Sequence, residues 1–311
     1  MLALLLVACA SFAVIPYDPD WSFAAAGPYD ACGWRSDGYL ACSTNFGGSD
    51  LHVSPITQAL DEGFRGAGFA GVAVADYAAC TLQLGAGLDT GYPVCFGSAE
   101  HALVDGDPAS AVTDVLDPLS LVAGERHACG LSPEGAPSCW GDDSVGQSSP
   151  PEGPFLTLAA GSDHTCGLDP DGLATCWGGD LDAPPAYVIK GDPGTAEVAA
   201  GHGITCTLTG DQDIWCSSDP TDAGDTSPWT DGIDADSALH GIAVGDLGLC
   251  ALDEEDEIRC VFAYEPTDPP HGRFRTVSMA SRRAFGCGVT EDGDLSCFGT
   301  NDEPALEDWN N

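Results

Sequence analysis

Hydrophobic and polar positions along the chain recur in a short pattern that predicts β-hairpins. In "HTCGLDPDGLATCWG" (residues 164–178), apolar residues and cysteines alternate with small or polar ones on both sides of a polar turn. Pro170 suits the first corner of such a turn, and Gly172 supplies a permissive backbone. The segment therefore predicts two antiparallel strands in which Cys166 and Cys176 lie opposite each other.

The hairpin pattern occurs seven times along the chain. Its other copies begin at Asp30, Ala78, His127, Ile204, Gly248 and Phe285. The first cysteines of the copies recur about every 42 residues, a period typical of propeller blades. Apolar runs such as residues 155–161 and 196–201 precede the hairpins and predict a further strand of the same sheet. We therefore predict an all-β fold, a β-propeller.

The two ends of the chain predict how the ring closes. A further strand is expected within residues 186–201, and residues 12–27 have nearly the same shape. The chain after Cys297 has no such strand. We infer that the N-terminal strand completes the last blade and closes the ring, because closure removes open sheet edges. Residues 12–311 would then form a single propeller domain.

The fifteen cysteines divide into seven pairs and Cys9. The members of a pair are ten residues apart, except for one pair that is fifteen apart. Such regular pairing is typical of an oxidising compartment and favours disulfides over metal ligands, which need closer spacing. The predicted disulfides are Cys32–Cys42, Cys80–Cys95, Cys129–Cys139, Cys166–Cys176, Cys206–Cys216, Cys250–Cys260 and Cys287–Cys297.

The start of the chain, "MLALLLVACASFAVI", is apolar but too short to span a bilayer of ~30 Å. It is typical of a secretory signal. "LVAC" (residues 6–9) resembles a bacterial lipobox, which predicts removal of the signal before Cys9 and lipidation of that cysteine. "ACA" fits ordinary cleavage after Ala10 instead. We favour a lipoprotein of the bacterial cell envelope, in the outer membrane and held only by its lipid; free secretion is the alternative.

The net charge of −40 changes the expected partners, because such a surface repels phosphate backbones and disfavours nucleic acids. Aspartate pairs such as Asp169 with Asp171, or Asp292 with Asp294, could instead supply carboxylate ligands for a calcium ion. These residues lie on turns that need Asp and Gly for their backbone. We therefore expect no cofactor, with calcium as the less favoured alternative.

Sequence motifs of catalytic or metal-binding sites are absent from the chain. The chain has no Gly-x-Ser-x-Gly elbow, HExxH motif or phosphate-binding loop, so we predict no catalytic and no metal-binding residues. His127 and His164 share one repeat position and predict a structural hydrogen bond near the strand start. Trp140 and Trp177 follow the second cysteine and predict packing between blades.

Three segments outside the repeat are candidates for binding: residues 44–68, 98–118 and 217–240. Insertions between blades map to loops, where propellers usually bind. Within them Trp229 is a bulky aromatic residue in polar surroundings, and we single it out as a candidate binding anchor.

Residues 121–178 closely resemble regulator of chromosome condensation repeats, in the bacterial secreted version with the pattern "AG..H.C.L...G...CWG....GQ". Elsewhere the match is weaker: "GQ" occurs once, at Gly146 and Gln147, and other residues replace the tryptophan of CWG. The resemblance implies a seven-bladed β-propeller that acts as a binding scaffold.

We therefore expect a monomeric, non-enzymatic scaffold that binds a protein or a glycan at the cell surface through its loops. One alternative is a lyase or hydrolase with a site in the central channel, which needs polar groups converging at one mouth. The other is a purely structural envelope component.

Overall fold

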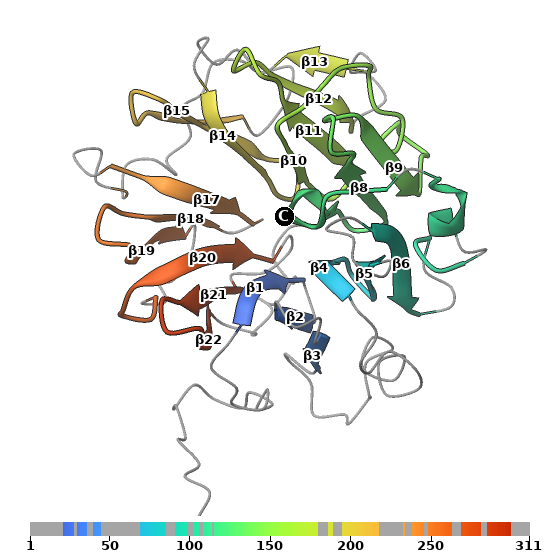
Figure 1. Ribbon diagram of the computed structural model, residues 1–311. Helices are drawn as coiled ribbons and strands as arrows, with labels where there is room; N and C mark the ends of the chain where they lie inside the picture. Colours follow the sequence, from blue (N-terminus) through green and yellow to red (C-terminus); the bar gives the residue numbers. More distant parts are fainter. Residues whose placement is uncertain are drawn as a thin grey trace, which may run out of the picture.

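Seven small antiparallel sheets surround a central axis in the computed structural model of the protein (Figure 1). We number them blades 1 to 7 in chain order. Within each blade the first strand is innermost and later strands add outward, so neighbouring blades meet mainly through their first strands. The structure describes residues 21–27, 30–35, 40–44, 69–84, 91–98, 102–105, 108–113, 115–179, 186–188, 195–217, 233, 238–245, 248–262, 269–280 and 285–299.

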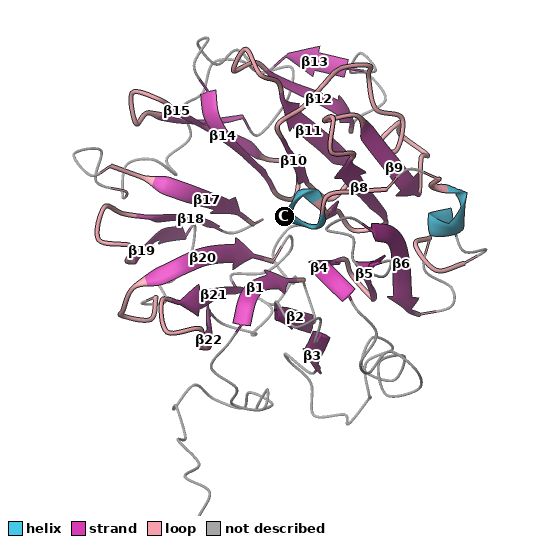
Figure 2. Cartoon of the chain, in the orientation of Figure 1, coloured by secondary structure: helices cyan, strands magenta, loops and turns pink. Residues whose placement is uncertain are grey.

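Strands make up nearly all of the regular structure (Figure 2). Blades 1 to 3 contain β1 (Trp21–Ala26), β2 (Asp30–Arg35), β3 (Leu40–Thr44), β4 (Phe69–Val74), β5 (Ala78–Leu84), β6 (Gly91–Gly97), β7 (Val122–Ala123), β8 (His127–Leu131) and β9 (Pro137–Gly141). Blades 4 and 5 contain β10 (Thr157–Ala160), β11 (His164–Leu168), β12 (Ala174–Gly178), β13 (Ala186–Val188), β14 (Thr195–Ala200), β15 (Thr205–Thr209) and β16 (Ile214–Ser217). Blades 6 and 7 contain β17 (His240–Val244), β18 (Gly248–Leu252), β19 (Ile258–Phe262), β20 (Phe274–Met279), β21 (Phe285–Thr290) and β22 (Leu295–Gly299). Two short 3-10 helices, η1 (Pro108–Ala111) and η2 (Pro118–Ser120), precede blade 3.

The predicted fold class is confirmed: the chain is a seven-bladed β-propeller. Within the described residues, only blade 4 has a fourth strand, β13, which lies in the segment predicted to hold a further strand. Blade 3 has none although residues 142–156 are all described, and Pro150, Pro151 and Pro154 give a reason, since proline cannot donate to a strand ladder. No helix among the described residues is long and apolar enough to cross a membrane.

One disulfide joins the second and third strands of every blade, as the fold prediction expects. In blade 4, Cys166 pairs with Cys176 in the strand register, and their Cα atoms are 3.9 Å apart. The longer separation of Cys80 and Cys95 leaves the same opposed register, because the extra residues fall between the paired strand ends. Each cross-link therefore stays within a single hairpin.

The residue three positions after the first cysteine caps the hairpin turn in blades 3 to 7. Asp169 Oδ1 accepts the backbone N–H groups of Asp171 and Leu173, both at 2.9 Å. Asp253 does the same in blade 6. Blades 3, 5 and 7 use the hydroxyls of Ser132, Thr209 and Thr290. The capping side chain satisfies backbone donors that the tight turn leaves without a strand partner.

The residue six positions after the first cysteine has a left-handed backbone. It is glycine in blades 3, 4 and 7, but Gln212 (φ 74°) in blade 5 and Asp256 (φ 63°) in blade 6. This residue also contacts the next blade: Phe155 N–H donates to Gly135 O at 2.8 Å, and Phe274 N–H donates to Asp256 O at 2.7 Å. The hairpin turn of one blade thus accepts a hydrogen bond from the start of the next.

The same hydrogen bond joins the two ends of the ring. Trp21 N–H donates to Gly293 O of blade 7 at 3.1 Å, and β1 packs against β20 and β21. The Trp21 ring is buried over Gly33, where a Cβ atom would lie 2.7 Å from it. The closing strand is predicted within residues 12–27; of these, the structure describes 21–27, which contain β1 of blade 1, and the others lie outside the described part of the chain. Within the described part of the chain, blade 7 has three strands, and it meets blade 1 by packing and by hydrogen bonds outside the strand ladders.

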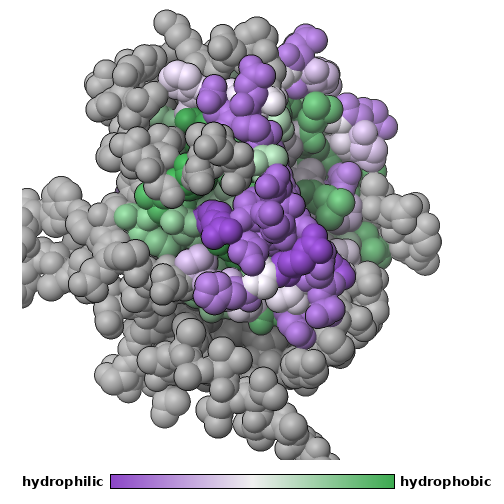
Figure 3. Space-filling model, turned by 90° about the vertical axis from the view of Figure 1, so that its left-hand side faces the viewer, coloured by the Kyte–Doolittle hydropathy of each residue, from purple (hydrophilic) through white to green (hydrophobic). Residues whose placement is uncertain are grey.

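Arginine and carboxylate side chains form exposed ion pairs at the rim of blades 6 and 7. Arg273 Nη2 of blade 7 lies 2.8 Å from Asp256 Oδ2 of blade 6 and 3.6 Å from Glu291 Oε1. Arg259 Nε lies 2.6 Å from Asp253 Oδ2 within blade 6. Both arginine side chains are more than half exposed, at 57% and 53%. Hydrophilic residues accordingly cover much of the described surface on this side of the ring (Figure 3).

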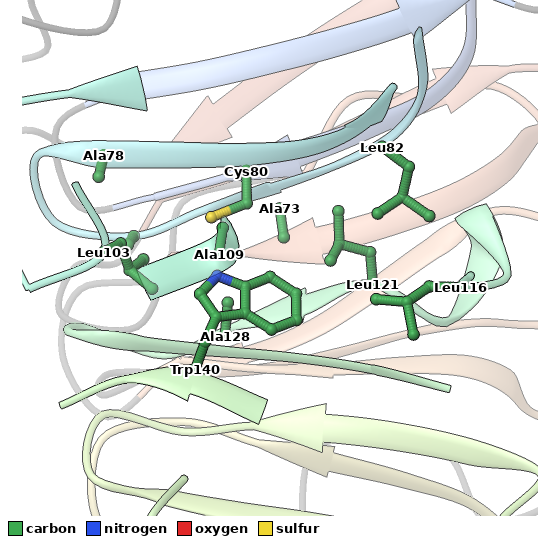
Figure 4. Close-up of a cluster of buried hydrophobic side chains, with 11 residues drawn as sticks. Ala73, Ala78, Cys80, Leu82, Leu103, Ala109, Leu116, Leu121, Ala128 and Trp140 are labelled. Atoms are coloured by element: carbon green, nitrogen blue, oxygen red, sulfur yellow. The ribbon is translucent and has the colours of Figure 1, made fainter. Parts of the chain in front are cut away.

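The hydrophobic core is divided among the junctions between blades. Between blades 2 and 3, the ring of Trp140 lies among small and aliphatic side chains that include Cys80, Leu103 and Leu121 (Figure 4). Leu103 and Leu116 are fully buried, although both belong to residues 98–118, one of the predicted binding segments. The described part of that segment therefore contributes to the core.

The turns of the blades define two faces of the ring. We call the side with the turns between first and second strands the inner-turn face. The side with the turns between second and third strands, where the chain also enters each first strand, is the hairpin face. In an antiparallel sheet, successive turns lie at opposite ends, so these two faces are opposite each other.

Candidate functional site

Two buried histidines link three successive blades. His127 Nε2 of blade 3 lies 2.8 Å from Thr165 Oγ1 of blade 4, and His164 Nε2 lies 2.7 Å from Thr205 Oγ1 of blade 5. Each imidazole packs over the glycine that ends the preceding first strand. At Gly161, a Cβ atom would lie 2.3 Å from the His164 Cε1 atom. The predicted structural hydrogen bond is confirmed, and it crosses from one blade to the next.

Burial keeps both histidines uncharged. Burial, with a smaller contribution from the nearby His164, lowers the pKa of His127 from 6.5 to about 4. Burial also lowers the pKa of His164 to about 4, with a smaller contribution from His202. Neutral imidazoles fit a structural role here, since a charged ring would be buried without a carboxylate partner.

Three polar residues from blades 3, 4 and 5 meet on the inner-turn face. Ser162 Oγ lies 2.6 Å from His202 Nδ1, and Glu125 Oε1 lies 3.2 Å from the same nitrogen. Their backbones are also joined, because Glu125 N–H donates to Ser162 O and Ser162 N–H donates to Gly201 O, both at 3.2 Å. The cluster therefore ties three successive inner turns together.

Serine, histidine and an acidic residue also form the catalytic triads of hydrolases, so the geometry of this cluster tests whether the protein could be such an enzyme. A catalytic triad places the nucleophile at one imidazole nitrogen and the carboxylate at the other. Here both Ser162 and Glu125 face Nδ1 of His202. Ser162 is also only 2% exposed, which keeps a substrate from its hydroxyl. The arrangement is one of structural hydrogen bonds and lacks the relay that activates a serine.

The acidic turns use their oxygens for the backbone. Asp169 Oδ1, one of the candidate calcium ligands, already accepts two backbone N–H groups. Within the described ranges, no three His, Cys, Asp or Glu side chains gather in a group that could hold a metal ion.

The predicted packing of Trp140 and Trp177 between blades is confirmed. Trp177 is fully buried against residues of blade 3, and its Nε1 donates to Gln147 O at 3.1 Å. Thr165 Oγ1 donates to the same carbonyl at 3.2 Å. The carbonyl of the buried Gln147 thus connects Trp177 to Thr165, whose hydroxyl contacts His127. This contact explains why the GQ and CWG motifs and the histidine occur together in the repeat.

A groove of about 310 Å³ lies between blades 3 and 4 on the hairpin face. Its lining includes Leu119, Leu131, Pro133, Phe155, Leu156 and Pro170. Leu119 is 80% exposed and Leu156 is 65% exposed, the two highest values among the exposed large hydrophobic residues of the described chain.

The two leucines occupy the same repeat position, five residues before the glycines that end the first strands. Blades 5, 6 and 7 carry Ala196, His240 and Arg275 there. A bulky aliphatic side chain at this exposed position is therefore a property of blades 3 and 4, and the repeat does not require it.

Acidic residues border this groove. Asp117 and Glu134 belong to its lining. Residues 115–179 contain nine Asp or Glu and a single basic residue, Arg126, which lies in an inner turn on the opposite face. The lining therefore combines apolar side chains with two acidic residues, Asp117 and Glu134, which we call the rim of the groove.

Trp229, the predicted binding anchor, and Cys9, the predicted lipidation site, lie outside the described residues, as do nearly all of residues 44–68 and most of residues 217–240. Sequence reasoning missed Leu119 and Leu156. An alignment of the repeats would have identified them, because it shows leucine in two blades at a position where three other blades have a small or polar residue.

Residues 156–181 match the family described as regulator of chromosome condensation (RCC1) repeat. No curated protein matches the sequence. The fold is similar to the ectodomain of the Physcomitrella patens receptor kinase CR4, with 20% identity, a TM-score of 0.62 and coverage of 89% of this chain and 72% of that one. It is also similar to the CRINKLY WD40 ectodomain of the Arabidopsis thaliana receptor kinase ACR4, with 18% identity, a TM-score of 0.62 and coverage of 90% and 95%.

A third similar structure is Prp20p from Saccharomyces cerevisiae, with 15% identity, a TM-score of 0.58 and coverage of 90% of this chain and 82% of that one. At these identities the likeness concerns the fold, and the matched repeat falls within blade 4, whose histidine, disulfide and tryptophan are described above. The chain is therefore a seven-bladed β-propeller that contains a regulator of chromosome condensation repeat.

Proposed function

We propose that the protein is a non-enzymatic scaffold that binds another protein through the hairpin face of its propeller. The groove with its exposed Leu119 and Leu156 carries this proposal, because clustered apolar side chains on an exposed surface are typical of interaction sites. The ring that presents them is cross-linked in every blade and hydrogen-bonded between blades, so the surface is preorganised.

A protein fits the groove better than a glycan does. Sugar hydroxyl groups would lose water against leucine and proline without gaining hydrogen bonds, whereas apolar side chains gain from the same contact. Prp20p is described by its binding to Gsp1p and histones, so at least one propeller of similar fold binds proteins. The net charge of −40 argues against nucleic acids as partners.

The proposed location is an oxidising compartment, with Cys9 as the lipid-bearing first residue of a monomeric envelope protein. Seven disulfides support the compartment. The intact mass of the protein from its native source, before and after reduction, tests this. We expect an acylated Cys9 and a gain of fourteen hydrogens, two for each of the seven disulfides. Free thiols in the native protein would contradict the proposed compartment.

Site-specific photo-crosslinking tests the binding function. A photoreactive amino acid is placed at position 156 on the hairpin face and, as a control, at the exposed position 163 on the inner-turn face. We expect one protein, identified by mass spectrometry, to be captured through position 156 and to bind the purified propeller. Capture through neither position, in cells that express the variants at normal levels, would contradict the proposal.

A further inference from the structure

Building on the proposed function, we infer that the groove between blades 3 and 4 binds an extended protein segment whose bulky apolar side chain is flanked by Lys or Arg. Three observations carry this inference: two exposed leucines in register, backbone groups that are already bonded, and a rim of one charge.

The leucines supply the apolar contact. Leu119 begins the chain entry into blade 3 and Leu156 the entry into blade 4, so one side chain stands on each side of the junction. Pro133 of the blade 3 hairpin and Pro170 of the blade 4 hairpin line the same groove. Because all four side chains are aliphatic, water at this position is best displaced by an aliphatic or aromatic side chain.

Backbone N–H groups at the groove already donate hydrogen bonds within the protein. A partner is therefore expected to be recognised through its side chains. Leu156 N–H donates to Leu168 O at 2.7 Å, and Leu119 N–H donates to Asp117 Oδ1 at 2.9 Å. A segment that bound by adding a strand would need free backbone donors and acceptors. The occupant therefore binds by inserting side chains between the leucines.

The rim supplies the charge preference. Asp117 and Glu134 lie at the groove, and Asp169 and Asp171 flank Pro170. The one basic residue of 115–179, Arg126, is on the opposite face. Cationic side chains on both sides of the apolar anchor would meet this rim with opposite charge, which speeds association and fixes orientation.

A second copy of this chain is disfavoured as the occupant. Each copy has a net charge of −40, and bringing two such surfaces together is repulsive. A segment of a different protein, with local positive charge, does not meet this repulsion.

Fluorescence anisotropy with a labelled, end-blocked peptide of alternating lysine and leucine tests the inference. Two control peptides replace the leucines by serine or the lysines by glutamate. The propeller variants are L119S/L156S and D117N/E134Q, which change the groove, and W215S, which changes an exposed side chain of blade 5 outside the groove (45% exposed). Far-UV circular dichroism and melting of each variant check that the ring stays folded.

We expect L119S/L156S to weaken binding of the lysine–leucine peptide at least about tenfold, because the apolar burial is lost. W215S should leave the affinity unchanged, and D117N/E134Q should reduce it mainly at low salt. Both control peptides should bind at least about tenfold more weakly than the lysine–leucine peptide.

Equal affinity of the wild type and L119S/L156S would overturn the inference, because the peptide would then be held by charge elsewhere on the acidic surface. Such a result would still leave the scaffold function standing if the crosslinking experiment captured a partner. Failure of crosslinking together with groove-dependent peptide binding would instead contradict the proposed function alone.

Discussion

Two junctions between blades differ in the chemistry of their polar contacts: the one between blades 3 and 4 and the one between blades 6 and 7. Between blades 3 and 4 the polar contacts are buried and neutral: His127 meets Thr165, and Trp177 meets the carbonyl of Gln147. Between blades 6 and 7 they are exposed and charged, with Arg273 bound to Asp256.

The residue at the left-handed turn position contributes to this contrast. Where it is glycine, as at Gly135, the next blade can pack directly on the turn through Phe155. Where it is Asp256, the turn carries a carboxylate that binds Arg273 in addition to the backbone contact. One backbone geometry therefore serves both an apolar junction and an ionic one, and the two should respond differently to mutation, pH and salt.

The largest effect expected from a single substitution is the loss of the tryptophan in the neutral junction. Trp177→Ala removes a fully buried ring, and we expect it to lower the free energy of unfolding by about 3–5 kcal/mol. Urea denaturation with the disulfides intact measures this change. Trp215→Ala, at a 45% exposed position, is the matched control and should cost about 0.5 kcal/mol or less. Equal losses in both variants would refute the assignment of Trp177 to the core of the junction.

Acid should loosen the neutral junction next. His127 and His164 have a folded-state pKa of about 4 against 6.5 when exposed, so between these values the unfolded chain binds protons that the folded chain does not. Stability is therefore full above pH 6.5 and falls as the pH drops toward 4, by up to about 1.4 kcal/mol per pH unit for each histidine.

Urea denaturation between pH 7 and pH 4.5 measures this dependence. In His164→Gln, an amide keeps a donor for Thr205 but does not titrate, so the variant should lose about half of the histidine-dependent slope. Comparing the two slopes cancels the titration of the carboxylates. A slope unchanged by the substitution would show that the histidines are not its source.

A smaller effect is expected from deleting one hydroxyl. Thr205→Val leaves the buried His164 Nε2 without its partner and should cost about 1–3 kcal/mol. Thr276→Val in blade 7 is the matched control, because Thr276 Oγ1 is buried and has no hydrogen-bond partner in the described part of the chain. That substitution should be neutral or stabilising in the same urea titration. The reverse order of the two variants would contradict the role of the histidine contact.

The smallest effect is expected at the ionic junction. Arg273→Ala removes an exposed ion pair with Asp256, and exposed pairs contribute little because water and salt screen them. The melting temperature should not change beyond experimental error at physiological salt. A shift that grows at low salt would be consistent with this account, whereas a large shift independent of salt would show that the rim pair holds the blades together.

The sequence predicts the blades well, because their determinants are local. Cysteines ten residues apart around a Pro-Asp-Gly turn define strand, turn and register, and the disulfide of Cys166 with Cys176 follows directly. The packing of Trp140 and Trp177 between blades also follows, because alternation in a strand fixes which face a side chain meets.

The sequence predicts the candidate site poorly, because that site depends on how neighbouring blades meet. Leu119 and Leu156 are 37 residues apart in the sequence, and only the ring brings them to one groove. The partners of His127 and His202 likewise come from other blades. Trp229, chosen because it is a bulky residue among polar ones, lies outside the described residues and stays a prediction.

The locality of the disulfides has a mechanical consequence. Each cross-link spans ten residues, or fifteen in blade 2, and none connects one blade to another. A pulling force on the two ends of the chain would therefore meet only noncovalent resistance between blades. The blades would separate from one another in sequence under force. The residues between the two cysteines of each hairpin would not extend until the disulfide was reduced.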